Sequence, residues 1–516
     1  MVYPIDTAND WLLPLGVFLP VAGMVVMLFV PRAEEQLLKV VALVTALATV
    51  AVGAYTLAAF DYDRAGTLQF YVNEPWIDTI RSRFIMGCDG MSLPLYILTM
   101  VITLLCIVYS WNHIPEPGNV KAFLMLILLL QVGMAGTFVA QDLILFFVFF
   151  EIVLLPMYFM IGVWGGEQRR YASLKFFLFT LFGSAFLLLS FIALFFKSGA
   201  SSAPDGNFSI EYLMANSSSI TSTTAVIIFG GMFLGFAIKV PMFPLHTWLP
   251  DAHTEAPTVG SVILAAILLK LGTYGFIRIA IPILPDAAKE WAPWIGGLAV
   301  IGIIYGALCC LAQTDMKRLI AFSSVSHMGF VMLGIATLTP FGFNAAVFGM
   351  VAHGLITGML FFLAGSVKER YHTLEIRRMS GILKQAPRLG WILGFCAMAS
   401  LGLPGLAGFW GEFPAILSAY SPVEGLSVEL FRVYMVFAAV GTVLAAAYLL
   451  WLYQRTAFGE PTPEFAHDGH IHDVETPEWI AWTPLLIAIL VLGIYPNILF
   501  SVMSPAVDLA LQAYGE

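Results

Sequence analysis

Four charged residues fall near the centres of long apolar runs in this 516-residue sequence: Glu151, Lys239, Lys270 and Glu412. A charged side chain at the centre of a bilayer costs about 2.5–3.5 kcal/mol on insertion scales, so four uncompensated charges would cost on the order of 10 kcal/mol. That sum is comparable to the whole stability of a protein. These residues must therefore be paired or hydrated, and buried carboxyl and ammonium groups of this kind can carry protons.

Glu151 is the natural partner of Lys239. It follows the run FFVFF and precedes Pro156. At an assumed separation of about 6 Å and an effective dielectric constant near 20, the pair is worth roughly 3 kcal/mol. Movement or neutralisation of the carboxylate would then switch Lys239 between holding and releasing a proton. Lys270 can receive that proton, and Glu412 can deliver it toward the outer face of the membrane.

Two histidines at bilayer depth suit the intervening steps, because imidazole gains and loses protons near neutral pH. They are His327 in SSVSHMGF and His353 in VAHGLITG. Each can equally be a hydrogen-bonded core residue. The four charges have static alternatives too: a fixed ion pair for the first two, extension toward a helix break for Lys270, and hydrogen bonds to freed backbone amides for Glu412.

The elements that must position these groups are two interrupted helices. The run from Gly235 to Lys270 contains His246 and His253 and is broken by three prolines, Pro241, Pro244 and Pro250. Proline removes a backbone donor and clashes with the preceding turn, which predicts a break. A second break is predicted in ASLGLPGLAGFWGEF, just before Glu412. Paired breaks five spans apart indicate two inverted five-helix repeats with broken helices 7 and 12.

The composition places the chain in a membrane. It is 59% hydrophobic and 11% charged, with a mean hydropathy of +0.88, whereas soluble domains carry roughly 25% charged residues. Apolar runs of about 20 residues predict an all-α polytopic protein of about fourteen spans. Lys and Arg are enriched in the loops after odd-numbered spans, which predicts that both termini lie on the outer side.

Four segments follow from this pattern. We expect N-terminal spans 1–3 in residues 1–115, a first repeat (helices 4–8) in 116–282, a second repeat (helices 9–13) in 283–457, and a loop with helix 14 in 458–516. That loop carries His467, His470 and His472, which could bind a metal, although a solvated loop is the favoured interpretation. Nucleotide, dinucleotide and iron–sulfur motifs are missing from the sequence, so redox cofactors are expected in other chains.

Three stretches together resemble the antiporter-like subunits of respiratory complex I, the proton-translocating NADH–quinone oxidoreductase. They are IKVPMFPLHTWLPDAHTEAPTVGSVILAAILLKLGTYG, QTDMKRLIAFSSVSHMGF and LFFVFFEIVLLPMYFMIGVWGG. The glutamate in GFWGEF favours the M type, also called subunit four, because its two sister subunits tend to carry lysine there.

The resemblance implies proton translocation driven by quinone reduction elsewhere in the complex. It implies Glu151 and Lys239 as a paired switch, Lys270 as the central carrier and Glu412 as the exit carrier. The connecting relay would comprise three histidines, His246, His327 and His353. His253 matches the motif without an assigned role.

The same resemblance implies the surroundings of the chain. NADH, flavin, iron–sulfur clusters and ubiquinone or menaquinone would belong to partner subunits of the respiratory chain. The other partners would be the remaining membrane-arm subunits, including the two sister subunits, with no nucleic acid. A bacterial plasma membrane is expected ahead of the mitochondrial inner membrane. Three alternatives stay open: a subunit of an Mrp-type cation/proton antiporter, the arm of a membrane-bound hydrogenase, and a passive scaffold.

Overall fold

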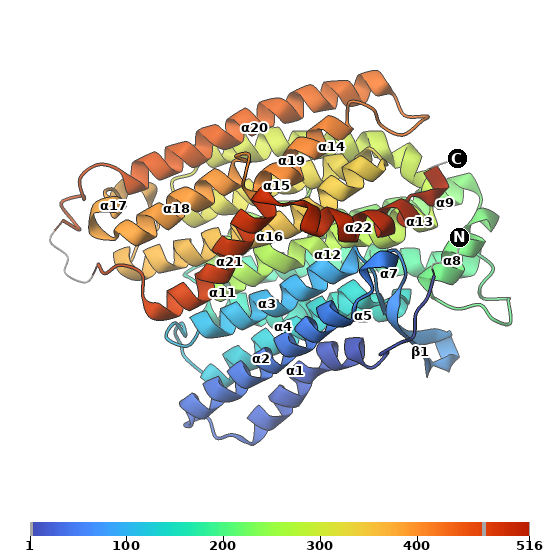
Figure 1. Ribbon diagram of the computed structural model, residues 1–516, viewed down its shortest axis with the longest axis horizontal. Helices are drawn as coiled ribbons and strands as arrows, with labels where there is room; N and C mark the ends of the chain where they lie inside the picture. The colour runs from blue at the N-terminus through green and yellow to red at the C-terminus, as the bar shows by residue number, and fades with distance from the viewer. Residues whose placement is uncertain (1–3, 467–470, 515–516) are drawn as a thin grey trace.

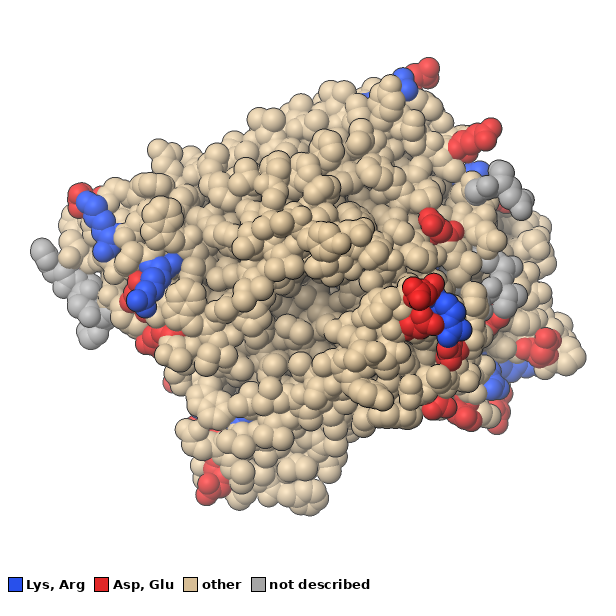
Figure 2. All heavy atoms as spheres, in the orientation of Figure 1, with Lys and Arg blue, Asp and Glu red and all other residues tan. Residues whose placement is uncertain are grey.

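The computed structural model describes residues 4–466 and 471–514. The chain forms a bundle of long helices whose axes run in roughly the same direction (Figure 1). On the face drawn in Figure 2, charged side chains gather at the two ends of the bundle and an uncharged belt lies between them. Thirteen helices of the described residues are long and apolar enough to cross a membrane. The prediction of a polytopic helical membrane protein is confirmed.

The spans follow one another with few intervening elements. The first six are α1 (Leu12–Phe29), α2 (Glu35–Ala59), α3 (Ser92–Tyr109), α4 (Val120–Val139), the pair α5 (Leu143–Ile152) and α6 (Leu154–Trp164), and α7 (Arg169–Lys197). The next are α9 (Ser222–Lys239), the composite helix α11 (Thr258–Ile263), η4 (Leu264–Leu268), α12 (Leu269–Gly275), η5 (Phe276–Ala280) and α13 (Ile281–Ile283), and then α14 (Pro285–Ala312). The last are α15 (Met316–Ala336), α16 (Pro340–Tyr371), α20 (Val428–Ala457) and α21 (Thr476–Ile494).

Shorter elements lie between the spans and at their ends. The helices are α8 (Ile210–Asn216), α10 (Trp248–Glu255), α17 (Ile382–Gln385), α18 (Pro387–Ser400), α19 (Ala407–Ser418) and α22 (Asn497–Ala510). Between α2 and α3 the chain forms a small antiparallel sheet of β1 (Gln69–Ile77) and β2 (Ser82–Cys88). This hairpin was not predicted, because apolar runs long enough to span a membrane give no information about strands in the segments between them.

We call the two ends of the bundle the hairpin end and the basic end. The β1–β2 hairpin and both ends of the described chain lie at the hairpin end (Figure 1). The loops that follow α3, α6, α14, α16 and α20 lie at the basic end, which takes its name from the lysines and arginines that the sequence places there.

The core of the bundle consists of the helices that carry Lys270, His327 and His353. In the most apolar 18-residue stretch of the composite helix α11–α13, 100% of the residues are buried, and the same is true of α16. The share of buried residues is 94% in the corresponding stretch of α15 but only 28% in that of α20. Polar groups on the first three helices are therefore shielded from lipid by the rest of the chain.

Two non-helical stretches of the described chain contain the prolines and glycines that predict interruptions. Between α9 and α10, residues 240–247 form turns that contain Pro241 and Pro244. Pro250, expected to break the chain as well, lies in the first turn of α10, where a missing backbone donor is tolerated. Between α18 and α19 the chain turns at Gly402 and Gly405, which have φ of +80° and +92°, values that glycine adopts without steric cost.

The span expected near residue 402 therefore consists of two helices. They contain 14 and 12 residues, too few for either to cross a bilayer alone. This pair accounts for the difference between the expected fourteen spans and the thirteen long helices of the described chain.

Two of the three histidines of the 458–475 loop, His467 and His470, lie outside the described residues. His472 is described, and its Nε2 atom lies 2.8 Å from Glu475. Within residues 4–466 and 471–514, no group of three His, Cys, Asp or Glu side chains is arranged to hold a metal ion.

Candidate functional site: a buried row of titratable groups

Lys270 lies at the centre of the bundle, where the composite helix changes its hydrogen-bonding pattern. It is the second residue of α12, between the two π-helical segments η4 and η5. π-Turns are rare and are found frequently at functional sites. The Lys270 side chain is 0% exposed; its Nζ donates to the carbonyl of Ala265 and lies 2.7 Å from Nδ1 of His353 on α16. The central lysine is therefore already in contact with one predicted relay histidine.

A second contact joins His327 on α15 to Glu412 on α19. Nδ1 of His327 lies 2.5 Å from the carboxylate of Glu412. Nε2 of the same ring lies 3.2 Å from the hydroxyl of Ser400 and 3.1 Å from that of Tyr448. All four side chains are buried. The predicted exit carrier and the second relay histidine thus form one hydrogen-bonded unit.

A small cavity lies between these two contacts. His327, His353, Ser400 and Glu412 are among its lining residues, and it leaves about 20 Å³ for the centre of a water molecule. The rings of His327 and His353 are 6.1 Å apart, and in the described chain Nε2 of His353 and Oε2 of Glu412 have no hydrogen-bond partner. A cavity of this size with polar groups on its wall can hold a water. One water would complete a row from Lys270 to Glu412.

Glu151 and Lys239 are arranged differently. The hydroxyl of Ser184 on α7 donates to the Glu151 carboxylate. Lys239 is 2% exposed and is the last residue of α9, where the negative end of the helix dipole favours a cation. Its ammonium lies 4.6 Å from the centre of the Phe150 ring. Among the described residues no ion pair within 4.0 Å joins the two groups, but their charges interact through space.

The two histidines near the first interruption lie in apolar surroundings. His246 is 2% exposed, with its ring 5.1 Å from Tyr305, and within the described chain its Nδ1 has no hydrogen-bond partner. The ring of His253 stacks on Phe361 at 4.3 Å. The structure therefore does not place His246 in hydrogen-bond contact with Lys239 or Lys270.

An open cavity of about 510 Å³ leads inward from the basic end. Glu255, Lys317, Lys368 and Glu369 are among the residues that line it. Lys317 is 4% exposed and donates to the carbonyl of Ala256, next to the interruption. The cavity gives water access to the basic-end side of the composite helix.

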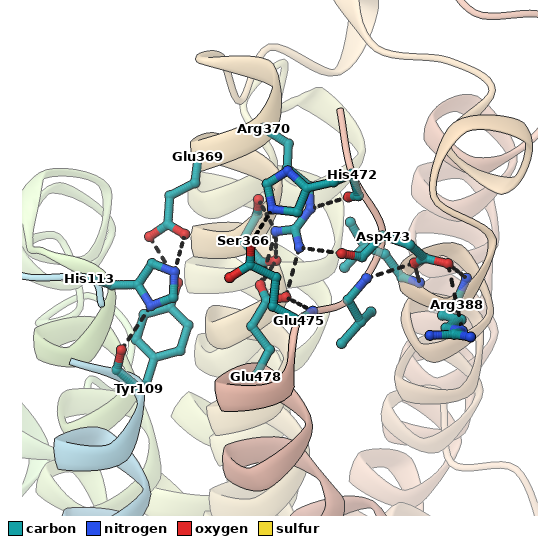
Figure 3. A network of polar contacts seen from close by, with 12 residues as sticks. Tyr109, His113, Ser366, Glu369, Arg370, Arg388, His472, Asp473, Glu475 and Glu478 are labelled. Atoms are coloured by element: carbon teal, nitrogen blue, oxygen red, sulfur yellow. Dashed lines mark hydrogen bonds and ion pairs between the residues drawn. The ribbon is translucent and has the colours of Figure 1, made fainter. Parts of the chain in front are cut away.

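The rim of this cavity carries an ion pair between His113 and Glu369 (Figure 3). Nε2 of His113 lies 3.0 Å from the carboxylate, and its ring stacks on Tyr109. Burial disfavours the charged imidazole, but the hydrogen bond and the negative charge of Glu369 outweigh burial and raise the pKa of His113.

Four polar residues of this region were missed by the sequence analysis: Ser184, Ser400, Tyr448 and Lys317. The first three are uncharged, and a single serine or tyrosine is unremarkable within a span, so their sequence positions do not distinguish them. Ser400 has one detectable signal, since it directly precedes the glycine-rich interruption. Lys317 lies in the sequence at the end of a polar turn, as a loop residue would, and its burial becomes visible only when α10 and α15 are packed together.

The chain is similar to known families and proteins along most of its length. The family described as "NADH:quinone oxidoreductase/Mrp antiporter, TM" matches residues 140–445. The family described as "NADH-ubiquinone oxidoreductase chain 4, amino terminus" matches residues 65–137. NADH-quinone oxidoreductase subunit M of Rickettsia typhi is 38% identical over 503 residues, which cover 96% of this chain and 98% of that protein.

Solved structures share the same fold. A chain of respiratory complex I from Thermus thermophilus, determined with bound NADH, is 30% identical with a TM-score of 0.86, covering 98% of this chain and 100% of that one. A chain of the Mrp complex from Dietzia sp. DQ12-45-1b has a TM-score of 0.83 at 19% identity, covering 98% of each chain. At that identity the likeness shows the fold alone.

The fold and the buried titratable groups thus define an antiporter-like membrane protein. More particularly, this chain belongs to the chain-4 family of NADH–quinone oxidoreductases, whose bacterial relatives are named subunit M. The resemblance inferred from the three sequence motifs is confirmed.

Proposed function

We propose that this chain translocates protons across a bacterial plasma membrane as a subunit of respiratory complex I, in which quinone reduction supplies the energy. The observation that carries the proposal is the buried row from Lys270 through His353 and His327 to Glu412. Apolar side chains would stabilise the interior of a membrane protein at a lower free-energy cost than such a row of titratable groups, so stability does not explain the row. Its chemistry is that of proton transfer between positioned acids and bases.

Glu151 and Lys239 would act as the switch that precedes this row. Because they interact through space and not by contact, a change in the position or charge of Glu151 alters how firmly Lys239 holds its proton. The proton would pass to Lys270 and onward to Glu412. We assign His246 to the relay as the resemblance implies, with water required to connect it.

The inverted repeat is part of the proposal. The interruption between α9 and α10 would be that of helix 7 in a repeat covering 116–282, and the interruption between α18 and α19 that of helix 12 in a repeat covering 283–457. The basic end would face the cytoplasm, with both termini outside. NADH, flavin, iron–sulfur clusters and quinone would bind partner subunits, among them the two sister antiporter-like chains.

An Mrp-type antiporter is the less supported alternative. The relatives that are 30–38% identical carry the NADH–quinone oxidoreductase or complex I name, whereas the Mrp chain is 19% identical. Copurification distinguishes the two functions: redox subunits in the purified complex support the oxidoreductase, and sodium-driven proton flux without them would support the antiporter.

The direct test replaces Lys270 by methionine in the intact complex. We expect Lys270→Met to lower NADH-driven proton pumping by at least about tenfold, while electron transfer from NADH to a water-soluble acceptor persists. Lys197→Met is the matched control, because Lys197 is an exposed lysine at the end of α7. Pumping at the wild-type level in the Lys270 variant would remove the case for the row.

A further inference from the structure

A fully buried ion pair lies at the hairpin end of the helix that carries Lys270. Arg278, in the π-helical segment η5, places one guanidinium nitrogen 2.6 Å from both carboxylate oxygens of Asp89. Both side chains are 0% exposed. The proposed row uses neither residue.

Hydroxyl groups surround this pair. Nε of Arg278 donates to the hydroxyl of Tyr274 at 3.0 Å, and Ser92 lies 2.8 Å from the same hydroxyl. The Tyr274 hydroxyl in turn donates to the carbonyl of Phe138, at the end of α4. The Asp89 carboxylate also accepts the backbone N–H of Ser92. The cluster therefore joins the start of α3, the end of α4 and the composite helix.

Its position is between Lys270 and the hairpin end. Along the composite helix the order outward is Lys270, Tyr274 and Arg278, and eight residues of helix correspond to about 12 Å. The Lys270 ammonium is bound in other directions, back to the carbonyl of Ala265 and sideways to His353. The cluster thus lies on the direct route along the composite helix by which a proton on Lys270 could leave through the hairpin end.

We propose that Arg278 and Asp89 form a proton seal, which closes this direct path and leaves His353 as the outlet from Lys270. The inference rests on the proposed function of Lys270. A guanidinium is not deprotonated in proteins, so it cannot pass a proton on. Because Arg278 contacts both oxygens of Asp89, that carboxylate is also not available as a proton relay between the hydroxyls of Ser92 and Tyr274 and the outside.

Loss of the guanidinium would open the seal. A buried carboxylate without a counter-ion takes up a proton in preference to remaining charged. The resulting carboxylic acid can give its proton to one neighbour and regain one from another, as a relay does. Removal of the carboxylate as well would take away the only group in this pair that can titrate and so restore the seal.

The chain offers a matched control at the basic end. Arg370 on α16 lies 2.7 Å from the carboxylate of Glu478 on α21, with side chains 2% and 1% exposed (Figure 3). Ser366 contributes a hydroxyl there, as Ser92 does in the first cluster. The two pairs are similar in chemistry and burial but lie at opposite ends of the bundle, so a purely structural role predicts similar effects for both.

The test measures passive proton influx into liposomes that contain the intact complex, with no NADH and an imposed potassium diffusion potential. We expect Arg278→Gln to raise the influx several-fold, and Asp89→Asn combined with Arg278→Gln to return it to the wild-type rate. Arg370→Gln should not raise it. The seal would be overturned if Arg278→Gln left proton influx at the wild-type rate, or if the double variant showed the same influx as Arg278→Gln alone.

Two further variants keep the test decisive. If the Arg278→Gln complex does not assemble, Arg278→His is tested in its place. A protonated imidazole can pair with Asp89 and a neutral one cannot, so the proton leak should rise between about pH 6 and about pH 8. A leak that does not change with pH would contradict the seal. Lys270→Met in the Arg278→Gln background should abolish the leak, and persistence of the leak contradicts a path through Lys270. Because the influx assay is run without NADH and needs no pumping, a failure of the proposed function can be distinguished from a failure of the seal.

Discussion

The two regions of this protein that carry its intramembrane carboxylates hold them in opposite ways. Glu151 is bound to Ser184 and influences Lys239 across a gap that no hydrogen bond closes. Glu412 is in direct contact with His327 beside a cavity that can hold a water. Within the proposed function, the first arrangement would transmit a change of charge and the second would pass a proton. We therefore propose that the first region controls the row and that the second conducts.

The two regions should differ in whether they depend on the charge or on the length of the carboxylate side chain. A through-space interaction falls off slowly with distance, so the first region should tolerate a shorter side chain that keeps its charge. A hydrogen bond weakens steeply when its geometry is lost, so the second region should not. Aspartate and glutamine at each position separate the two dependences.

The largest effect is expected at Glu151, because its negative charge interacts with the buried Lys239 ammonium. Glu151→Gln should reduce NADH-driven pumping by about 100-fold, within the range for loss of an acid–base group. Glu151→Asp should retain most of it. Pumping is measured as vesicle acidification per NADH oxidised. Equal losses in the two variants would show that contact, and not charge, matters at this position.

Glu412 should show the reverse sensitivity with a smaller loss, because water in the adjoining cavity can replace part of its contact. Glu412→Asp withdraws the carboxylate from His327 by about one C–C bond, 1.5 Å. It should therefore lower pumping nearly as much as Glu412→Gln, by about tenfold. The same acidification assay applies. Wild-type pumping by the aspartate variant would contradict the contact mechanism.

The cavity itself can be filled. Ala352 is one of its lining residues, and Ala352→Leu should displace the water and slow pumping by a few-fold, with overpacking that costs about 1–3 kcal/mol. Ala447→Leu on the exposed face of α20 is the matched control. Thermal unfolding in detergent monitors the packing cost. An unchanged pumping rate in the Ala352 variant would show that no water is needed there.

The smallest effect is expected at the rim of the basic-end cavity, outside both regions. The pKa of His113 is raised in the folded state above its ordinary value of 6.5, by Glu369 acting against burial. The contribution to stability is therefore fully present below pH 6.5 and is lost as the pH rises through the raised pKa. Because Glu369 is partly exposed, the contribution should stay below about 1 kcal/mol. The melting temperatures of wild type and His113→Gln should converge at high pH, and a constant difference would contradict this.

The sequence identified the charged members of the row because charge is rare and conspicuous in apolar runs. Proline and glycine act on the backbone of their own neighbourhood, and the stretches that contain them form turns at residues 240–247 and at Gly402 and Gly405. That these turns are the breaks of helices 7 and 12 stays a prediction. The sequence did not show which side chains touch. The contacts of His327 with Ser400 and Tyr448 join three helices, and they depend on helix rotation and rotamers that no local pattern records.

The π-helical segments around Lys270 escaped prediction for a related reason. An apolar run such as VILAAILLK fits an α-helix as well as a π-helix, and the wider turn is selected by what packs on it. The hydrogen bond from Ser184 to Glu151 could not be predicted either, because a serine in a span is most simply a small packing residue. Chemistry that depends on charge could be read from the sequence, and chemistry that depends on proximity could not.

The direction of the row has an electrical consequence. From Lys270 to Glu412 the row passes from helix to helix across a bundle whose axes run in roughly the same direction, so a proton that follows the proposed row would move mainly sideways within the bilayer. A charge does work of about 2.3 kcal/mol per 100 mV only where it crosses the field. The voltage dependence of transport should therefore reside in the steps that bring a proton to Lys270 and release it from Glu412, and the lateral transfer between them should be nearly insensitive to the membrane potential.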